Sequence, residues 1–174
     1  MGGYLVLSEK QIPMKHLTSL MGCNNGMILD LVSQSIRIKA NPGNYSDVLH
    51  NKSLLMIFEK PSLRTRVSFQ VGMHQLGGHS IVMETKDTPF REKESIADTA
   101  KASSRYCDII MARLFKQEDI EEMARNAAVP VINGLTDTFH PCQILSDMLT
   151  IYEKKRKLKG LKLCFVGDGN NNIT

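Results

Sequence analysis

The stretch Phe58-Glu59-Lys60-Pro61-Ser62-Leu63-Arg64-Thr65-Arg66-Val67-Ser68-Phe69 decides the fold class of this 174-residue chain. A hydrophobic run over residues 53–58 enters a turn rich in Ser, Thr and Arg, and the turn opens a helix predicted over residues 63–76. Helix N-termini carry unpaired N–H groups and partial positive charge, so they attract phosphate. The stretch therefore predicts a site for a small phosphorylated substrate. The alternative is an ordinary turn, in which Ser62 only caps the helix and the arginines are solvated.

Strand-like and helix-like segments alternate along the whole chain. The predicted strands cover residues 53–58, 80–83, 108–111, 129–132 and 161–166, and the predicted helices cover residues 9–40, 63–76, 94–106, 117–127 and 141–157. This alternation predicts an α/β fold, with a parallel sheet flanked by helices on both faces. Ligands of such sheets lie beyond the carboxyl ends of the strands. Arg113, His140 and Gln143 follow predicted strands, so we expect them at the same edge as residues 62–66.

Composition and charge restrict the class of protein. The chain is 42% hydrophobic and 23% charged, which is ordinary for a soluble globular protein. No run approaches the roughly 20 apolar residues of a membrane span, and the N-terminus does not resemble a secretory signal, so no membrane partner is expected. The four cysteines form no Cys-x-x-Cys pair, which favours reduced thiols, no zinc site and a cytoplasmic location.

The net charge of +4 is concentrated in residues 154–159, where five of the side chains are Lys or Arg. Such a run can contact nucleic acid, but it also lies where a helix is predicted to end, and cations there interact favourably with the helix dipole. No aromatic platform accompanies the run, so we expect a solvated helix end and no nucleic-acid partner.

Four motifs follow one another along the chain. Their residues are Ser62-Leu63-Arg64-Thr65-Arg66, Glu94-Ser95-Ile96-Ala97-Asp98-Thr99-Ala100, Met111-Ala112-Arg113 and His140-Pro141-Cys142-Gln143. In that order, they resemble the carbamoyl phosphate signature, a helix start, a strand end with a further arginine and the His-Pro-x-Gln motif of the aspartate/ornithine carbamoyltransferase family. The resemblance implies that residues 1–150 form a carbamoyl phosphate-binding domain.

The resemblance implies carbamoyl transfer, in which an amine attacks the carbonyl of carbamoyl phosphate while phosphate leaves, without a metal or another cofactor. The residues that it assigns to carbamoyl phosphate are Ser62, Leu63, Arg64, Thr65, Arg113, His140 and Gln143. Among these, Arg113, His140 and Gln143 are implied to be catalytic: Arg113 bridges phosphate and carbonyl oxygens, His140 polarises the carbonyl, and Gln143 orients the carbamoyl NH2. Arg66 is expected mainly to support the loop, and Cys142 to be a packing residue.

The acceptor amine is less closely defined. Leu63 replaces the family's usual Thr, and Gln70 replaces its usual Glu; N-acetylornithine carbamoyltransferases show a similar Pro-Ser-Leu-Arg-Thr-Arg motif. The leading prediction is transfer to ornithine, giving citrulline and phosphate. N-acetylornithine, putrescine and aspartate remain as alternative amines. A non-catalytic anion-binding or oligomer-forming module is an alternative of another class.

Residues 158–174 are expected to begin a second α/β domain, after a long helix that ends at about residue 157. The turn over residues 167–172 resembles that of family members that use ornithine, and this resemblance implies that Asn172 contacts ornithine. A dinucleotide-binding turn is the general alternative, but its third glycine and following helix are absent. Because these residues would form only the beginning of the second domain, we expect the chain to hold only the carbamoyl phosphate half of an active site. The loop over residues 86–91 resembles one that reaches a neighbouring subunit, which implies a homotrimer or a multiple of trimers.

Overall fold

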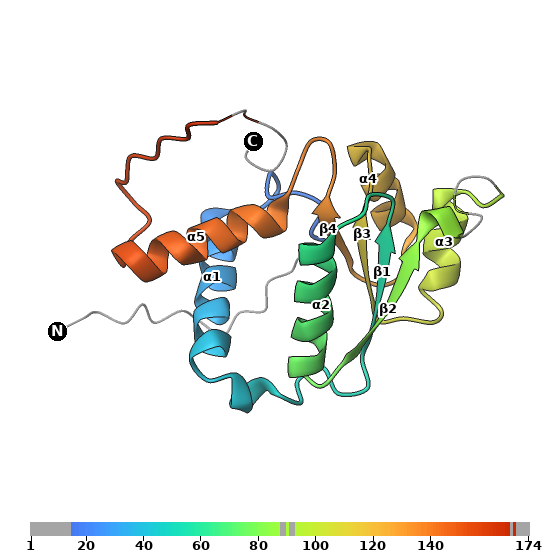
Figure 1. The fold of residues 1–174 in the computed structure, drawn as a ribbon, viewed down its shortest axis with the longest axis horizontal. Helices are drawn as coiled ribbons and strands as arrows, with labels where there is room; N and C mark the ends of the chain where they lie inside the picture. The colour runs from blue at the N-terminus through green and yellow to red at the C-terminus, as the bar shows by residue number, and fades with distance from the viewer. Residues whose placement is uncertain (1–14, 88–89, 91–92, 168, 170–174) are drawn as a thin grey trace.

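A computed structural model describes residues 15–87, 90, 93–167 and 169 of the chain. Four parallel strands form the centre of this described part: β1 (Ser53–Phe58), β2 (His79–Glu84), β3 (Ile109–Arg113) and β4 (Val131–Leu135). Their order in the sheet is β2-β1-β3-β4, so β1 pairs with both β2 and β3. Since the strands are parallel, their carboxyl ends meet at one edge of the sheet (Figure 1).

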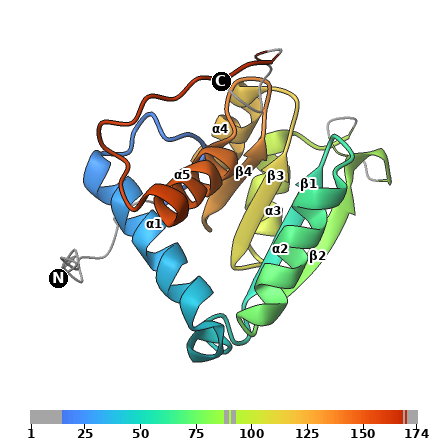
Figure 2. The same cartoon turned by 60° about the vertical axis from the view of Figure 1, so that its left-hand side comes forward.

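Helices cover both faces of the sheet. They are α1 (Asn25–Ala40), α2 (Leu63–Gln75), α3 (Ile96–Ser103), α4 (Gln117–Asn126) and α5 (Pro141–Lys155), with the short 3-10 helices η1 (Pro42–Tyr45) and η2 (Thr85–Asp87). Helices α2 and α5 lie on one face of the sheet, with α1 packed against α5, and α3 and α4 lie on the other face (Figure 2). No helix within the described ranges is both long enough and apolar enough to span a bilayer.

The alternation of side chains along β1 explains why this strand is almost continuously hydrophobic. Successive side chains of a strand point to opposite faces of the sheet. Met56 and Phe58 pack in one core cluster with Met73 of α2, whereas Ile57 packs in a second cluster with Ile120 of α4. Because helices cover both faces, neither set of side chains faces water.

The structure confirms the predicted order of strands and helices from residue 53 to residue 155. Strand β1 has the predicted bounds, whereas β3 and β4 begin later than predicted, at Ile109 and Val131, and continue to Arg113 and Leu135, beyond the predicted ends at residues 111 and 132. Helix α5 ends at Lys155, before the predicted end at residue 157, because Arg156 adopts the left-handed conformation (φ 57°) that commonly terminates helices.

The predicted helix over residues 9–40 is wrong for residues 15–24; residues 9–14 lie outside the described part. Helix α1 begins only after Asn24, whose side chain caps it by accepting a hydrogen bond from the Met27 N–H (3.0 Å). Leu17 instead forms a parallel bridge with Ile132 of β4. Its N–H donates to the Val131 carbonyl, and its carbonyl accepts from the Asn133 N–H, each at 2.8 Å. The exposed edge of β4 offers unpaired backbone groups, and pairing with them outweighs the helical pattern of this segment.

The strand predicted over residues 161–166 is also wrong for this structure. These residues are assigned to no strand. A strand needs hydrogen bonds to a neighbouring strand, and the sheet of the described chain consists of β1 to β4. The hydrophobic pattern of the segment therefore indicates the propensity for a strand but not its formation.

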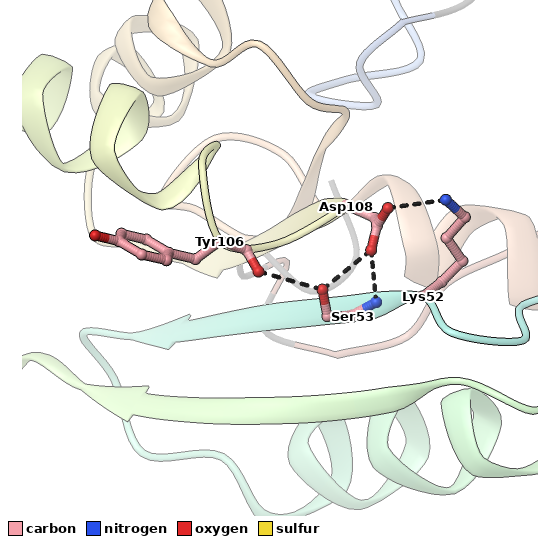
Figure 3. Close-up of polar contacts among 4 residues, drawn as sticks. All are labelled: Lys52, Ser53, Tyr106 and Asp108. Atoms are coloured by element: carbon pink, nitrogen blue, oxygen red, sulfur yellow. Dashed lines mark hydrogen bonds and ion pairs between the residues drawn. The ribbon is translucent and has the colours of Figure 1, made fainter.

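Asp108 joins β1 and β3 at the amino end of the sheet (Figure 3). Its Oδ2 accepts hydrogen bonds from the Ser53 backbone N–H (2.9 Å) and hydroxyl (3.0 Å), and its Oδ1 accepts one from Lys52 Nζ (2.9 Å). The hydrogen bond from the Ser53 backbone, followed by those from Lys52 and the Ser53 hydroxyl, lowers the pKa of Asp108 to about 2. The ionised carboxylate thus holds the two central strands together at the end opposite the candidate site.

Candidate functional site

The turn between β1 and α2 brings the N-terminus of α2 to the carboxyl edge of the sheet. Ser62 occupies the N-cap position with extended backbone (φ −157°, ψ 106°), but its hydroxyl makes no capping hydrogen bond. Ser62 thus occupies the capping position of α2 without a capping hydrogen bond from its side chain. The first N–H groups of an α-helix have no partner within the helix, so those of Leu63 and the next residues can serve a ligand. Leu63 is an exposed residue whose side chain has no polar atom, so only its backbone N–H suits this role.

Arg113, the last residue of β3, lies beside this turn. Its Nη1 donates a hydrogen bond to Thr65 Oγ1 (3.3 Å), which links positions far apart in the sequence. Burial lowers the pKa of Arg113, and the positive charge of Arg64 lowers it further. The Nε atom of Arg113 is buried and has no hydrogen-bond partner within the described residues. Two guanidinium groups and a hydroxyl group thus share one small region, which suits a doubly charged anion.

His140 lies at the N-cap position of α5, directly before Pro141, which is the first residue of the helix. Its Nδ1 atom is buried and, among the residues that the structure describes, has no hydrogen-bond partner. Burial lowers the pKa of His140, the charge of Arg113 lowers it further, and Asp147 acts weakly in the opposite direction. The imidazole is therefore neutral at pH 7 and can donate one N–H without adding another cation.

Gln143 is half-buried in the first turn of α5, and its Nε2 donates to Asp147 Oδ1 (2.9 Å). The side-chain oxygen of Gln143 is the atom that the predicted role requires, since it would accept from a carbamoyl NH2. Arg66 is exposed, and its Nη1 contacts Glu84 Oε1 (3.2 Å), which links α2 to the end of β2.

The sequence reasoning missed Glu84 at this edge. It lies at the carboxyl end of β2, and its Oε2 contacts Lys86 Nζ (2.8 Å). A hydrogen bond from Lys86 is the main cause of the lowered pKa of Glu84. A small pocket beside it is lined by Phe58, Glu59, Pro61, Glu84, Thr85 and Lys86. The signal that could have found Glu84 is its position, because it ends a strand next to β1.

Cys142 has the packing role that the sequence suggested. Its Sγ lies 3.6 Å from the Asn133 carbonyl, to which the thiol donates, and burial raises the pKa of Cys142 to about 11. A thiol with this pKa is a poor nucleophile at neutral pH. Within the described ranges, no group of three or more His, Cys, Asp or Glu side chains is placed to hold a metal ion. Asn172, the predicted ornithine contact, lies outside the described residues.

Comparisons with known proteins agree with this arrangement. The protein-family model described as "Aspartate/ornithine carbamoyltransferase, carbamoyl-P binding domain" matches residues 15–153. The ornithine carbamoyltransferase of Listeria innocua is 50% identical over 157 residues, which are 90% of this chain and 50% of that protein. The ornithine carbamoyltransferase of Anoxybacillus flavithermus is 56% identical over 136 residues, 78% of this chain and 43% of that protein. The chain thus spans about half the length of these curated relatives.

Solved structures share the fold. The structure of ornithine carbamoyltransferase from Pyrococcus furiosus matches with a TM-score of 0.86 and 45% identity, covering 91% of this chain and 51% of that one. An acetylornithine transcarbamylase complexed with acetylcitrulline matches with a TM-score of 0.72 and 31% identity, covering 81% and 48%. On the matches of sequence and fold, the chain belongs to the aspartate/ornithine carbamoyltransferase family, and its described core corresponds to the carbamoyl phosphate-binding domain of that family.

Proposed function

We propose that this chain supplies the carbamoyl phosphate half-site of an ornithine carbamoyltransferase, which makes citrulline and phosphate. The observation that carries the proposal is the meeting of the α2 N-terminus, Arg64, Arg113 and His140 at one edge of the sheet, with two buried nitrogen atoms that have no partner in the described chain. A buried polar group of this kind is costly unless it serves a ligand or a water molecule.

In the proposed complex, the phosphate is held by Ser62, Arg64, Thr65 and the N–H of Leu63. Arg113 bridges the phosphate and carbonyl oxygens, since its position beside Thr65 puts it next to the phosphate donors. His140 donates its N–H to the carbonyl oxygen, and Gln143 accepts from the carbamoyl NH2. Carbamoyl transfer then depends on holding the carbonyl for attack and on stabilising the oxyanion and the leaving phosphate.

Ornithine is the proposed acceptor because relatives that carry its name reach 50% identity, whereas the acetylornithine transcarbamylase structure is 31% identical. N-acetylornithine, putrescine and aspartate are the rival amines. We also propose that residues 158–174 begin a second, ornithine-binding domain, in which Asn172 contacts the amine. A homotrimeric assembly and a cytoplasmic location complete the proposal; the location is supported by the four cysteines, all of which are free thiols.

The phosphate site is tested by calorimetric titration of the 174-residue chain with carbamoyl phosphate and with inorganic phosphate. We expect Arg64→Ala to weaken binding at least about tenfold, because a charge-assisted hydrogen bond contributes about 1.5–3 kcal/mol. The matched control is Arg125→Ala, since Arg125 lies in the last turn of α4 on the other face of the sheet. Equal binding by Arg64→Ala and the unaltered chain would show that the phosphate site is assigned wrongly.

The half-site is tested by offering ornithine, N-acetylornithine, putrescine and aspartate in parallel with carbamoyl phosphate. We expect binding without transfer by this chain. Citrulline formed from ornithine would support the proposed acceptor and overturn the half-site. A carbamoyl product from another amine would show that this amine, and not ornithine, is the acceptor. Binding of carbamoyl phosphate without any product would distinguish a half-site from a chain that has no phosphate site.

A further inference from the structure

We propose that the buried Asn133 is a positioning residue that sets the geometry of both Arg113 and His140, an inference that rests on the proposed function. Asn133 lies in β4 and is fully buried, with 0% of its surface exposed. A buried side-chain amide is costly unless its oxygen and its two N–H groups are hydrogen-bonded. Its partners therefore indicate what the residue does, and they lie on both sides of the candidate site.

The oxygen of the Asn133 side chain is directed to the backbone opposite Arg113. The ladder between β3 and β4 shifts its register at this point: Ala112 pairs with Asn133, but Arg113 pairs with Leu135, so Gly134 is the extra residue of a bulge. Leu135 has a φ of 152°, a conformation that L-residues rarely adopt.

The Asn133 Oδ1 accepts a hydrogen bond from the Leu135 N–H at 2.9 Å, and the Leu135 carbonyl accepts one from the Leu114 N–H at 3.1 Å. A Cβ at Gly134 would lie 2.5 Å from Met111 Sδ, so the Met111 side chain would have to move to admit a larger residue. The Asn133 side chain thus holds the bulge that determines where Arg113 leaves the strand.

The nitrogen of the same side chain is directed to the segment before His140. The Asn133 Nδ2 donates to the Thr18 carbonyl at 2.9 Å and lies 3.3 Å from the carbonyl of Phe139, the residue before His140. The Phe139 N–H donates to Thr136 Oγ1 (3.2 Å), and the Thr136 N–H donates to the Phe139 carbonyl (3.0 Å). Residues 136–139 therefore form a closed turn that is attached to Asn133, and His140 follows it directly.

Gln117 completes this buried network from the start of α4. The Thr136 hydroxyl donates to Gln117 Oε1 at 2.6 Å, and Asn133 Nδ2 lies 3.3 Å from the same oxygen. An apolar side chain at position 133 would leave the Leu135 N–H and the Phe139 carbonyl without these partners. A carboxylate could accept from Leu135 but could not donate to Thr18 or Phe139. Only an amide supplies the acceptor on one side and the donors on the other.

The experiment compares Asn133→Ala with the unaltered chain in three measurements: inorganic phosphate affinity by calorimetry, the pKa of the His140 imidazole by NMR, and the melting temperature. We expect Asn133→Ala to weaken phosphate binding at least tenfold and to move the pKa of His140 toward its ordinary value. The matched control is Ser104→Ala. The Ser104 hydroxyl donates to the Ala100 carbonyl (2.7 Å) and accepts from the Ala128 N–H (3.0 Å), away from the site. We expect this variant to lower the melting temperature without changing the other two measurements.

An Asn133→Ala variant with unchanged phosphate affinity and an unchanged His140 pKa would overturn the inference. The inference would also be overturned if Ser104→Ala changed the phosphate affinity and the His140 pKa as much as Asn133→Ala does. If Asn133→Ala does not fold, the same measurements are made on Thr136→Val and Thr136→Ser. Of these two variants, only Thr136→Val removes the hydroxyl group from the turn. We expect Thr136→Ser to keep both site properties and Thr136→Val to lose them; identical values for the two variants would contradict the inference. If the unaltered chain binds no phosphate, the proposed function fails, whereas the His140 pKa still tests Asn133.

Discussion

Single residues at the carboxyl edge of the sheet combine strong positive charge with one neutral donor. The positive charge of Arg64 lowers the pKa of Arg113, and Arg113 in turn lowers the pKa of His140. An imidazolium here would add a third cation to a partly buried region. Burial and the neighbouring guanidinium keep the ring neutral, so it can donate a hydrogen bond to a carbonyl while the arginines neutralise the phosphate.

The first prediction concerns the protonation of His140. In the free chain we expect its pKa below the ordinary value of 6.5, and we expect it to rise when inorganic phosphate binds, because an anion stabilises the imidazolium. Replacing Arg113 by Met should raise this pKa, since it removes a cation, and Asp147→Asn should lower it. The measurement is an NMR titration of the ring nitrogens, with Arg125→Met as the control. A pKa at or above 6.5 in the free chain, or one that Arg113→Met leaves unchanged, contradicts the prediction.

At the scale of elements, the two ends of the sheet have different tasks. At the carboxyl end, the donors of the candidate site lie in the turn after β1, in the last residue of β3 and in the segment after β4. At the amino end, Asp108, the residue before β3, accepts hydrogen bonds from Ser53 at the start of β1. Strands that are fastened at the amino end, with both faces buried, form a rigid support, and turns on such a support can hold ligand-binding groups in fixed positions.

The second prediction concerns acid stability through Asp108. Its pKa is about 2 in the folded chain and about 3.9 in an unfolded one. The stabilisation by the ionised carboxylate is therefore complete above about pH 4 and is lost as the pH falls toward about 2. We expect Asp108→Asn to be less stable than the unaltered chain at pH 7, and the gap to narrow between about pH 4 and pH 2. Urea denaturation at a series of pH values measures this gap, and a gap that stays constant down to pH 2.5 rules the explanation out.

At the scale of the whole molecule, the two core clusters meet at the central strands β1 and β3. Ile110 of β3 is fully buried in the cluster that includes α3 and α4, whereas Ile81 of the edge strand β2 is 48% exposed. One sheet thus holds two isoleucine side chains in different environments, one buried and one half-exposed. The hydrophobic contribution to stability should follow burial, because removing apolar surface from water drives folding.

The third prediction compares these two isoleucines. We expect Ile110→Ala to lower the free energy of unfolding by about 2–5 kcal/mol, since it removes buried methylene groups and leaves a cavity. Ile81→Ala should lower the free energy of unfolding by no more than about 0.5–1 kcal/mol. Both values come from urea or thermal denaturation at pH 7. Similar losses for the two variants would show that the edge strand is covered in solution, for instance by another chain.

The amino-acid sequence by itself determined the fold class and the order of strands and helices from residue 53 to residue 155, and its motifs indicated the family to which the chain belongs. The fold class and the element order depend on short-range chemistry, namely hydrophobic periodicity and turn residues, whereas the family was indicated by the resemblance of the motifs. Only the tertiary structure decided the pairing of Leu17 with β4, the contact of Arg113 with Thr65 and the amide network of Asn133. The physical reason is distance along the chain. Leu17 and Thr18 lie far along the chain from residues 131–133, and the edge of β4 offers backbone hydrogen bonds that no local pattern of residues 15–24 could reveal.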